Sequence, residues 1–148
     1  MNQYIKQYQK SSIETASREQ ILIMLYDGCI QFLNKAKYLL ENDVKNVEEI
    51  HKNLVGAQNI IQEFINTLDH EVAPQLTANL ESLYEYFLRR LVQANMKKDV
   101  KAVEEVLRLV KSLRDTWAKA VEISQKEAAS SLNDDDEEDE EEDEEYEG

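Results

Sequence analysis

Apolar residues recur at helical spacing in four segments of the chain, each of about 25 residues. They follow one another three or four positions apart, which places them on one face of an α-helix. Few helix-breaking residues interrupt these segments, because the 148 residues include only three glycines and one proline. The pattern predicts long amphipathic helices with short connections, and therefore an all-α protein.

Residues that favour helix starts precede each segment. Ser17 followed by Gln20 has the spacing of a capping box, and Asn46 begins a similar box. Pro74 suits the first turn of a helix, and Asp99 can cap the last helix. The expected helices span residues 18–42, 46–70, 74–97 and, after the Asp99 cap, 100–127. Because short connections force consecutive helices to reverse direction, we expect an antiparallel up-down four-helix bundle.

Each expected helix has one apolar stripe that should form the core. The stripes are Leu22, Leu25, Cys29, Leu33, Ala36 and Leu40; Val47, Ile50, Leu54, Ala57, Ile61, Phe64, Ile65 and Leu68; Leu76, Leu80, Leu83, Tyr84, Phe87, Leu91 and Ala94; and Val103, Val106, Leu107, Val110, Leu113, Trp117 and Val121. Gly28 lies inside the first helix, where glycine costs about 1 kcal/mol relative to alanine. This cost indicates the close approach of another backbone.

The acidic residues are distributed unevenly along the chain. Twelve consecutive acidic residues at 134–145, together with Glu147, account for 13 of the 31 acidic residues. The rest of the chain has 18 acidic and 17 basic residues, so its net charge is about −1, compared with −14 for the whole chain. Because a long like-charge run repels itself, residues 129–148 are expected to be a disordered acidic tail. This tail either keeps the protein soluble or attracts a basic partner surface.

The tail leaves a four-helix domain at 17–128, preceded by a polar segment. Residues 1–16 carry scattered apolar side chains and are expected to form a flexible N-terminal arm. A single cysteine excludes an internal disulfide framework. No signal-peptide pattern and no apolar run of about 20 residues is present, so we expect a cytoplasmic protein without membrane insertion. The near-neutral body and acidic tail do not indicate nucleic-acid binding.

The sequence offers little to support catalysis. Glu48 and His51 have the Glu-x-x-His spacing of carboxylate-bridged di-iron bundles, which need the motif twice. The second copy is absent, because Thr67 stands three residues before His70. Cys29 lies on an apolar stripe, where a thiol usually serves as packing. We therefore expect no enzyme activity, no metal and no other cofactor.

Large apolar residues remain outside the four stripes: Ile23, Met24, Ile30, Tyr38, Val55, Ile60, Tyr86, Leu88, Val92 and Leu109. Contiguous apolar patches on a small bundle mark a partner surface, and an amphipathic segment of another chain could lie in a groove between two helices. Tyr8 and Ile13 of the arm could cover such a groove while the partner is absent. Wider stripes, or a homodimer of the free protein, are the alternative explanations.

Several motifs occur together in an order that resembles a known family. These are QYQKSSIETAS, LIMLYDGC, KNLVGAQNIIQEF, NLESLYEYFLRRLVQANMKKD and VEEVLRLVKSLRDTW, which cover roughly residues 4–122. In this order and spacing they resemble the FliS family of bacterial flagellin export chaperones. Arg18 stands where many members have proline, and the turn LDHEVAPQL lacks their Gly-Gly pair. The acidic tail is not a feature of the family.

The resemblance implies an antiparallel helical chaperone that acts in the cytoplasm without catalysis. It implies binding of the disordered C-terminal segment of flagellin, prevention of premature polymerisation and delivery to a component of the flagellar type III export gate. The candidate binding residues are Ile23, Met24, Ile30, Val55, Ile60, Leu88 and Val92 in a groove, Tyr8 and Ile13 as a lid, and Gln58, Asn59, Arg90 and Asn95 for register. A non-catalytic dimerisation or adaptor bundle is the alternative.

Overall fold

The structure is a computed structural model that describes residues 17–146, with the side-chain surroundings of residues 17–133. It contains α2 (Arg18–Asn42), α3 (Val47–Asn66), α4 (Pro74–Lys97) and α5 (Val100–Tyr146), and no strand occurs in this described part. The chain divides into a compact unit that ends at Arg114 and another that begins at Asp115.

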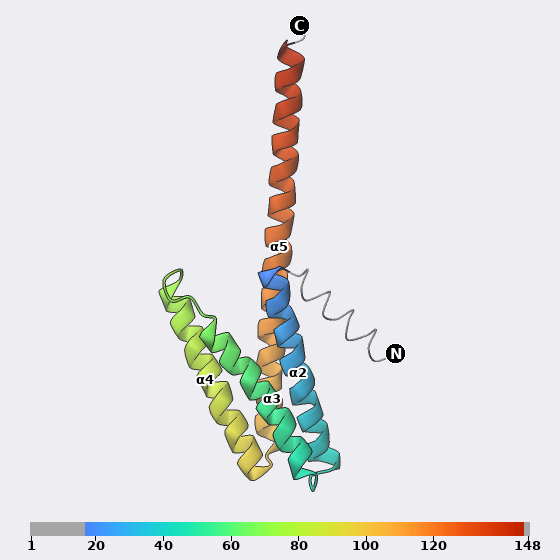
Figure 1. Cartoon of the computed structure of the whole chain (residues 1–148), viewed down its shortest axis with the longest axis vertical. Helices are drawn as coiled ribbons and strands as arrows, with labels where there is room; N and C mark the ends of the chain where they lie inside the picture. Colours follow the sequence, from blue (N-terminus) through green and yellow to red (C-terminus); the bar gives the residue numbers. More distant parts are fainter. Residues whose placement is uncertain (1–16, 147–148) are drawn as a thin grey trace. The chain divides into compact units, whose positions relative to one another are not determined.

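Within the first unit, successive helices run in alternating directions, and α3 lies between α2 and α4 (Figure 1). The start of α5 packs beside α4 and α2, because Glu105 contacts Arg90 of α4 and Glu104 contacts Lys37 of α2. These contacts close the ring of four helices. The predicted antiparallel four-helix bundle is confirmed. The second unit is the remainder of α5, and the domain boundaries predicted at 16 and 128 stay predictions.

The helix starts follow the predicted caps. The hydroxyl of Ser17 accepts a hydrogen bond from the Gln20 amide at 3.2 Å, and the Gln20 side chain accepts one from the Ser17 amide at 3.1 Å. The Asn46 side chain accepts a bond from the third residue of α3. α4 begins at Pro74, and the Asp99 carboxylate accepts the amide of the second residue of α5. Each start therefore has a local chemical cause.

Two predicted helix ends are wrong. α3 ends at Asn66 rather than at residue 70, and the Thr67 hydroxyl then donates to the Phe64 carbonyl at 3.0 Å. α5 continues to Tyr146 rather than stopping at residue 127. Residues 115–146 contain no glycine or proline, and they include nine glutamates and four alanines, which favour helices. The arm at 1–16 lies outside the described residues.

An aromatic cluster joins three helices in the core. Tyr26 of α2 stacks on Phe64 of α3 with ring centroids 4.4 Å apart, and Phe64 lies 5.4 Å from the ring of Tyr84 on α4. The hydroxyls of Tyr26 and Tyr84 are hydrogen-bonded at 2.5 Å. The core position predicted for Tyr84 is confirmed. Tyr26, which belonged to no predicted stripe, is fully buried as well.

The predicted stripes are correct in the middle of the bundle and less so at its ends. Buried stripe residues are Cys29, Leu33, Ala36, Leu40, Ile50, Leu54, Ala57, Ile61, Phe64, Phe87, Leu91, Ala94, Val103, Val106, Leu107 and Val110. Val47 and Leu76, both in the first turns of their helices, are exposed instead. Leu22 and Leu25 are only half-buried. A helix end has fewer neighbours than its centre, so the periodic pattern overstates burial there.

Two glycines lie on the sides of α2 and α3 that face each other. A Cβ atom on Gly28 would lie 3.4 Å from Cδ1 of Ile60, so its close neighbour is a side chain and the predicted approach of a backbone is wrong. A Cβ atom on Gly56 would lie 2.8 Å from the ring of Phe32. The phenylalanine ring therefore occupies the space that a side chain at position 56 would need.

Replacing each of the two glycines with alanine should change the free energy of unfolding in opposite directions. Gly28→Ala should raise the free energy of unfolding by about 0.5–1 kcal/mol, because alanine favours the helix and its Cβ fits beside Ile60. Gly56→Ala should lower it by about 1 kcal/mol or more, because the Cβ would overlap Phe32. Urea unfolding followed by circular dichroism compares each variant with the parent. A gain of stability in both variants would contradict this packing.

Candidate protein-binding surface

A hydrogen bond between two side chains connects α3 to α4 at the surface. The Asn95 amide nitrogen lies 2.7 Å from Nδ1 of His51, which acts as the acceptor. The Asn95 oxygen accepts a bond from the Lys98 ammonium group, also at 2.7 Å. Lys98 has a left-handed backbone with φ of 52° and forms the C-cap of α4. The end of α4 is therefore tied to the beginning of α3.

Apolar residues continue along both helices from this bond. Val55 and Gln58 follow His51 by four and seven residues, and Leu88 and Val92 precede Asn95 by seven and three. These spacings keep each set on one side of its helix. Because α3 and α4 are antiparallel neighbours, the two sets run side by side away from the His51–Asn95 bond. We call Val55, Gln58, Leu88, Val92 and Asn95 the α3–α4 surface.

The α3–α4 surface remains partly open to solvent. Val92 is 48% exposed, while Val55 and Leu88 are half-buried. Gln58 and Asn95 are also half-buried and add amide groups among the aliphatic side chains. The surface thus combines apolar area with hydrogen-bonding groups, as sites that bind a peptide segment do.

The other candidates lie elsewhere. Ile23 and Ile30 are half-buried on α2, and Met24 of the same helix is 38% exposed. Ile60 is half-buried and directed towards Gly28 of α2, so part of its side chain serves the bundle itself. Asn59 is exposed on α3. The structure therefore brings together five of the candidates and spreads the others over different sides. Tyr8 and Ile13 are outside the described residues.

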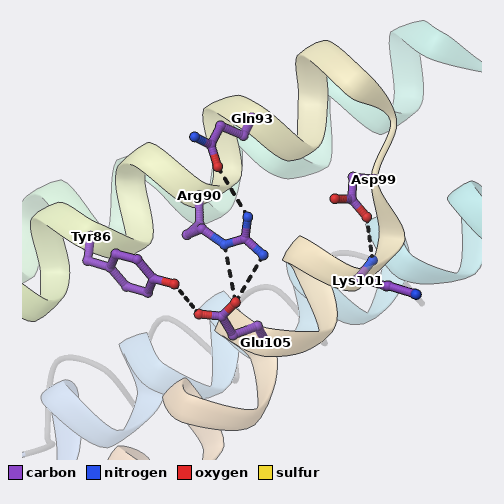
Figure 2. Close-up of polar contacts among 6 residues, drawn as sticks. All are labelled: Tyr86, Arg90, Gln93, Asp99, Lys101 and Glu105. Atoms are coloured by element: carbon purple, nitrogen blue, oxygen red, sulfur yellow. Dashed lines mark hydrogen bonds and ion pairs between the residues drawn. The ribbon is translucent and has the colours of Figure 1, made fainter.

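Arg90 belongs to a polar cluster between α4 and α5 (Figure 2). Its Nε and Nη2 atoms donate to one oxygen of Glu105 at 3.2 and 2.9 Å, and its Nη1 donates to Gln93 at 3.1 Å. The Tyr86 hydroxyl donates to the other oxygen of Glu105. Sequence reasoning missed this cluster, because Tyr86 and Glu105 are 19 residues apart and no short spacing connects them. Arg90 is therefore a structural link between the two helices.

The hydrogen bonds shift the acid–base properties of the cluster. The bond from Tyr86 is the main reason that the pKa of Glu105 is lowered, and Arg90 and Arg108 lower it further through a hydrogen bond and positive charge. The same bond to Glu105 is the main cause that raises the pKa of Tyr86. At neutral pH the cluster is therefore a carboxylate that accepts bonds from a phenol and a guanidinium group.

Side chains that could bind a metal ion do not gather in the described part of the chain. The described residues contain no group of three or more histidine, cysteine or acidic side chains that could hold a metal ion. Burial raises the pKa of Cys29 to about 12, so its thiol stays protonated and serves as packing. None of the helices in this part of the chain is long and apolar enough to cross a membrane.

Comparison with known proteins finds relatives that match most of the chain. The family model described as flagellar protein FliS matches residues 1–124. The chain is 40% identical over 124 residues to the flagellar secretion chaperone FliS of Bacillus subtilis (strain 168), covering 84% of this chain and 90% of that protein. It is 36% identical over 113 residues to the flagellar secretion chaperone FliS of Escherichia coli (strain K12), covering 76% and 82% respectively.

A solved structure has the same fold. The crystal structure of a flagellar chaperone from bacteria aligns with a TM-score of 0.66 and 21% sequence identity, covering 81% of this chain and 96% of that one. The fold and the sequence matches together define a flagellar secretion chaperone. The chain belongs to the FliS family, so the resemblance carried by its motifs is confirmed. The family is one of chaperones rather than of enzymes.

The polar cluster predicts a measurable pH dependence of stability. Glu105 has a lowered pKa in the folded protein, so its stabilising effect is present above the ordinary value of 4.5 and is lost as the pH falls through the lowered value. Glu105→Gln should lower the free energy of unfolding at neutral pH and make its decline on acidification shallower. Denaturant unfolding between about pH 2.5 and pH 7 measures both effects.

Glu104→Gln provides the matched control. Glu104 is the neighbouring carboxylate, but its ion pair with Lys37 is long at 3.9 Å and exposed. Such a pair contributes little, so this variant should keep the steep acid limb of the parent protein. If Glu105→Gln retained the same slope as the parent, the cluster would not contribute to stability as described.

Proposed function

We propose that this protein binds the disordered C-terminal segment of newly made flagellin in the bacterial cytoplasm. Binding keeps flagellin from polymerising early and helps to deliver it to a component of the flagellar type III export gate. Membership in the FliS family supports the proposal. The α3–α4 surface supports it too, because a partner can cover Val92 and the half-buried aliphatic residues beside it.

The energetics of binding favour an apolar surface. A segment that becomes ordered on binding loses about 2–5 kcal/mol or more of the gross interaction energy. Burial of about 1,000 Å² of apolar area contributes roughly 25 kcal/mol before the costs of association are subtracted. Apolar contacts can therefore provide the affinity. The amides of Gln58 and Asn95 would then fix the register of the bound segment through hydrogen bonds.

The single observation that carries the proposal is the 48% exposure of Val92 beside Val55 and Leu88 in a confirmed FliS chain. Val92→Glu should weaken binding of a flagellin C-terminal peptide at least tenfold, because a carboxylate would have to be buried against apolar atoms. Val55→Glu should have a similar effect. Isothermal titration calorimetry measures the affinity, and circular dichroism measures the folded state.

Val44→Glu is the matched control for this experiment. Val44 has nearly the same exposure as Val92, at 47%, but lies in the turn between α2 and α3. It should retain the affinity of the parent protein. Equal binding by Val92→Glu and the parent would reject the α3–α4 surface as the flagellin site. If the protein formed homodimers and did not bind the peptide, the result would instead favour a dimerisation bundle. Mass measurement with and without the peptide would distinguish the two outcomes.

The N-terminal arm is proposed as a competitor of the bound segment. Tyr8 and Ile13 are two of the apolar residues scattered through the mostly polar arm, and they could cover the same aliphatic residues that flagellin would cover. Arm and flagellin then exclude one another. The arm would protect the free chaperone from non-specific association and leave when the correct partner arrives.

Deletion of residues 1–13 tests this competition. The shortened protein should keep its helix content, because the capping box at Ser17 remains. It should bind more of a hydrophobic dye and bind the flagellin peptide several-fold more tightly, since no arm must be displaced. Dye fluorescence and calorimetry measure these changes. Tyr8→Ser with Ile13→Ser in the full chain should reproduce them, and unchanged dye binding in both proteins would count against a covering arm.

A further inference from the structure

Positive charge is concentrated in one part of the chain. Residues 86–114 hold eight basic and three acidic residues, a net charge of +5. Residues 17–85 hold five basic and eleven acidic residues, a net charge of −6. The near-zero total charge of the body conceals this excess. The end of α4 and the beginning of α5 therefore form a locally basic region.

Four exposed cations of this region form what we call the basic surface: Arg89, Lys97, Lys101 and Arg108. Lys101 and Arg108 are seven residues apart on α5, which places them on one side of that helix. Arg89 and Lys97 lie two turns apart on α4. Within the described residues, none of the four has a carboxylate at ion-pair distance.

Two carboxylates close to the basic surface accept hydrogen bonds from other groups. Glu105 accepts bonds from Tyr86 and Arg90, and Asp99 accepts the backbone amide of Lys101 at 3.0 Å (Figure 2). The positive charge of Arg108 also acts on Glu105. Glu104, between Lys101 and Arg108 on α5, is exposed and makes a long ion pair with Lys37 at 3.9 Å, so it reduces the positive excess of the region without cancelling it. The excess charge of the exposed cations is available to an anionic partner.

We propose that the acidic run at residues 134–147 of one molecule binds the basic surface of a second copy of the chain. The run carries 13 acidic residues, twelve of them consecutive, so its negative charge exceeds the positive charge of the four cations. α5 is helical from Val100 to Tyr146, and an acidic run from another copy can approach without a break in that helix. This association is separate from flagellin binding and uses other residues.

Electrostatic association of this kind must depend strongly on salt. An exposed ion pair contributes about 0–1 kcal/mol by itself, so the contact needs several pairs together. The screening length falls from about 10 Å at 0.1 M salt to about 3 Å at 1 M. A contact between apolar surfaces behaves in the opposite way, because many salts strengthen it. Salt dependence therefore separates this contact from an apolar dimer.

Sedimentation equilibrium of the full chain tests the proposal. At about 20 mM salt the average mass should rise from monomer towards dimer with protein concentration, and the dimer should weaken at least tenfold at about 500 mM. Lys101→Glu with Arg108→Glu should weaken it at least tenfold at low salt. A synthetic peptide of residues 134–147 should compete with the association and return the mass to that of the monomer.

Lys35→Glu with Lys52→Glu is the matched control. It makes the same change in net charge at two exposed lysines outside the basic surface, and its dimer should be as strong as that of the parent. A monomer at every salt and protein concentration would overturn the proposal, as would equal weakening by both pairs. A protein that binds single-stranded RNA at the basic surface but not the acidic peptide would also overturn it.

Discussion

The pairing of two buried hydroxyls controls how the helices face one another. Tyr26 and Tyr84 come from α2 and α4, and their hydroxyls meet 2.5 Å apart in the interior. A buried hydroxyl that loses its partner costs about 1–3 kcal/mol, so rotation of either helix is resisted. A rotation by one residue turns a helix by 100° and would separate the pair. Because this pair fixes the rotation of α4, it also places Leu88 and Val92 beside α3 rather than in the core.

The sequence predicted features that depend on neighbouring residues and missed those that depend on distant ones. Caps such as Ser17 act over three positions, and therefore the helix starts were predictable. The burial of Tyr26 was not, because six consecutive apolar residues hide the helical period and its partner is 58 residues away. The end of α3 likewise depends on a Thr67 side-chain bond that no pattern of apolar residues indicates.

The sequence allowed the residues of the candidate site to be predicted, but not their arrangement on the surface of the bundle. Helical spacing identified apolar residues outside the main stripes, yet it could not say which helix would lie beside each one. In the structure only Met24, Tyr38 and Val92 of that set are exposed, so the apolar surplus is smaller than the sequence implied. The His51–Asn95 bond, which joins α3 to α4, is what assembles Val92 with its neighbours.

α4 contributes residues to both of the proposed binding surfaces. Leu88 and Asn95 lie on the side towards α3, where apolar area and amides are available. Arg89 and Lys97 are exposed on the same helix and belong to the basic surface, whereas Tyr86 and Arg90 link α4 to α5 within the bundle. Apolar binding tolerates salt and depends on area, whereas ionic binding is screened and depends on charge number. A single helix can therefore serve two partners at once, and changes on one side need not disturb the other.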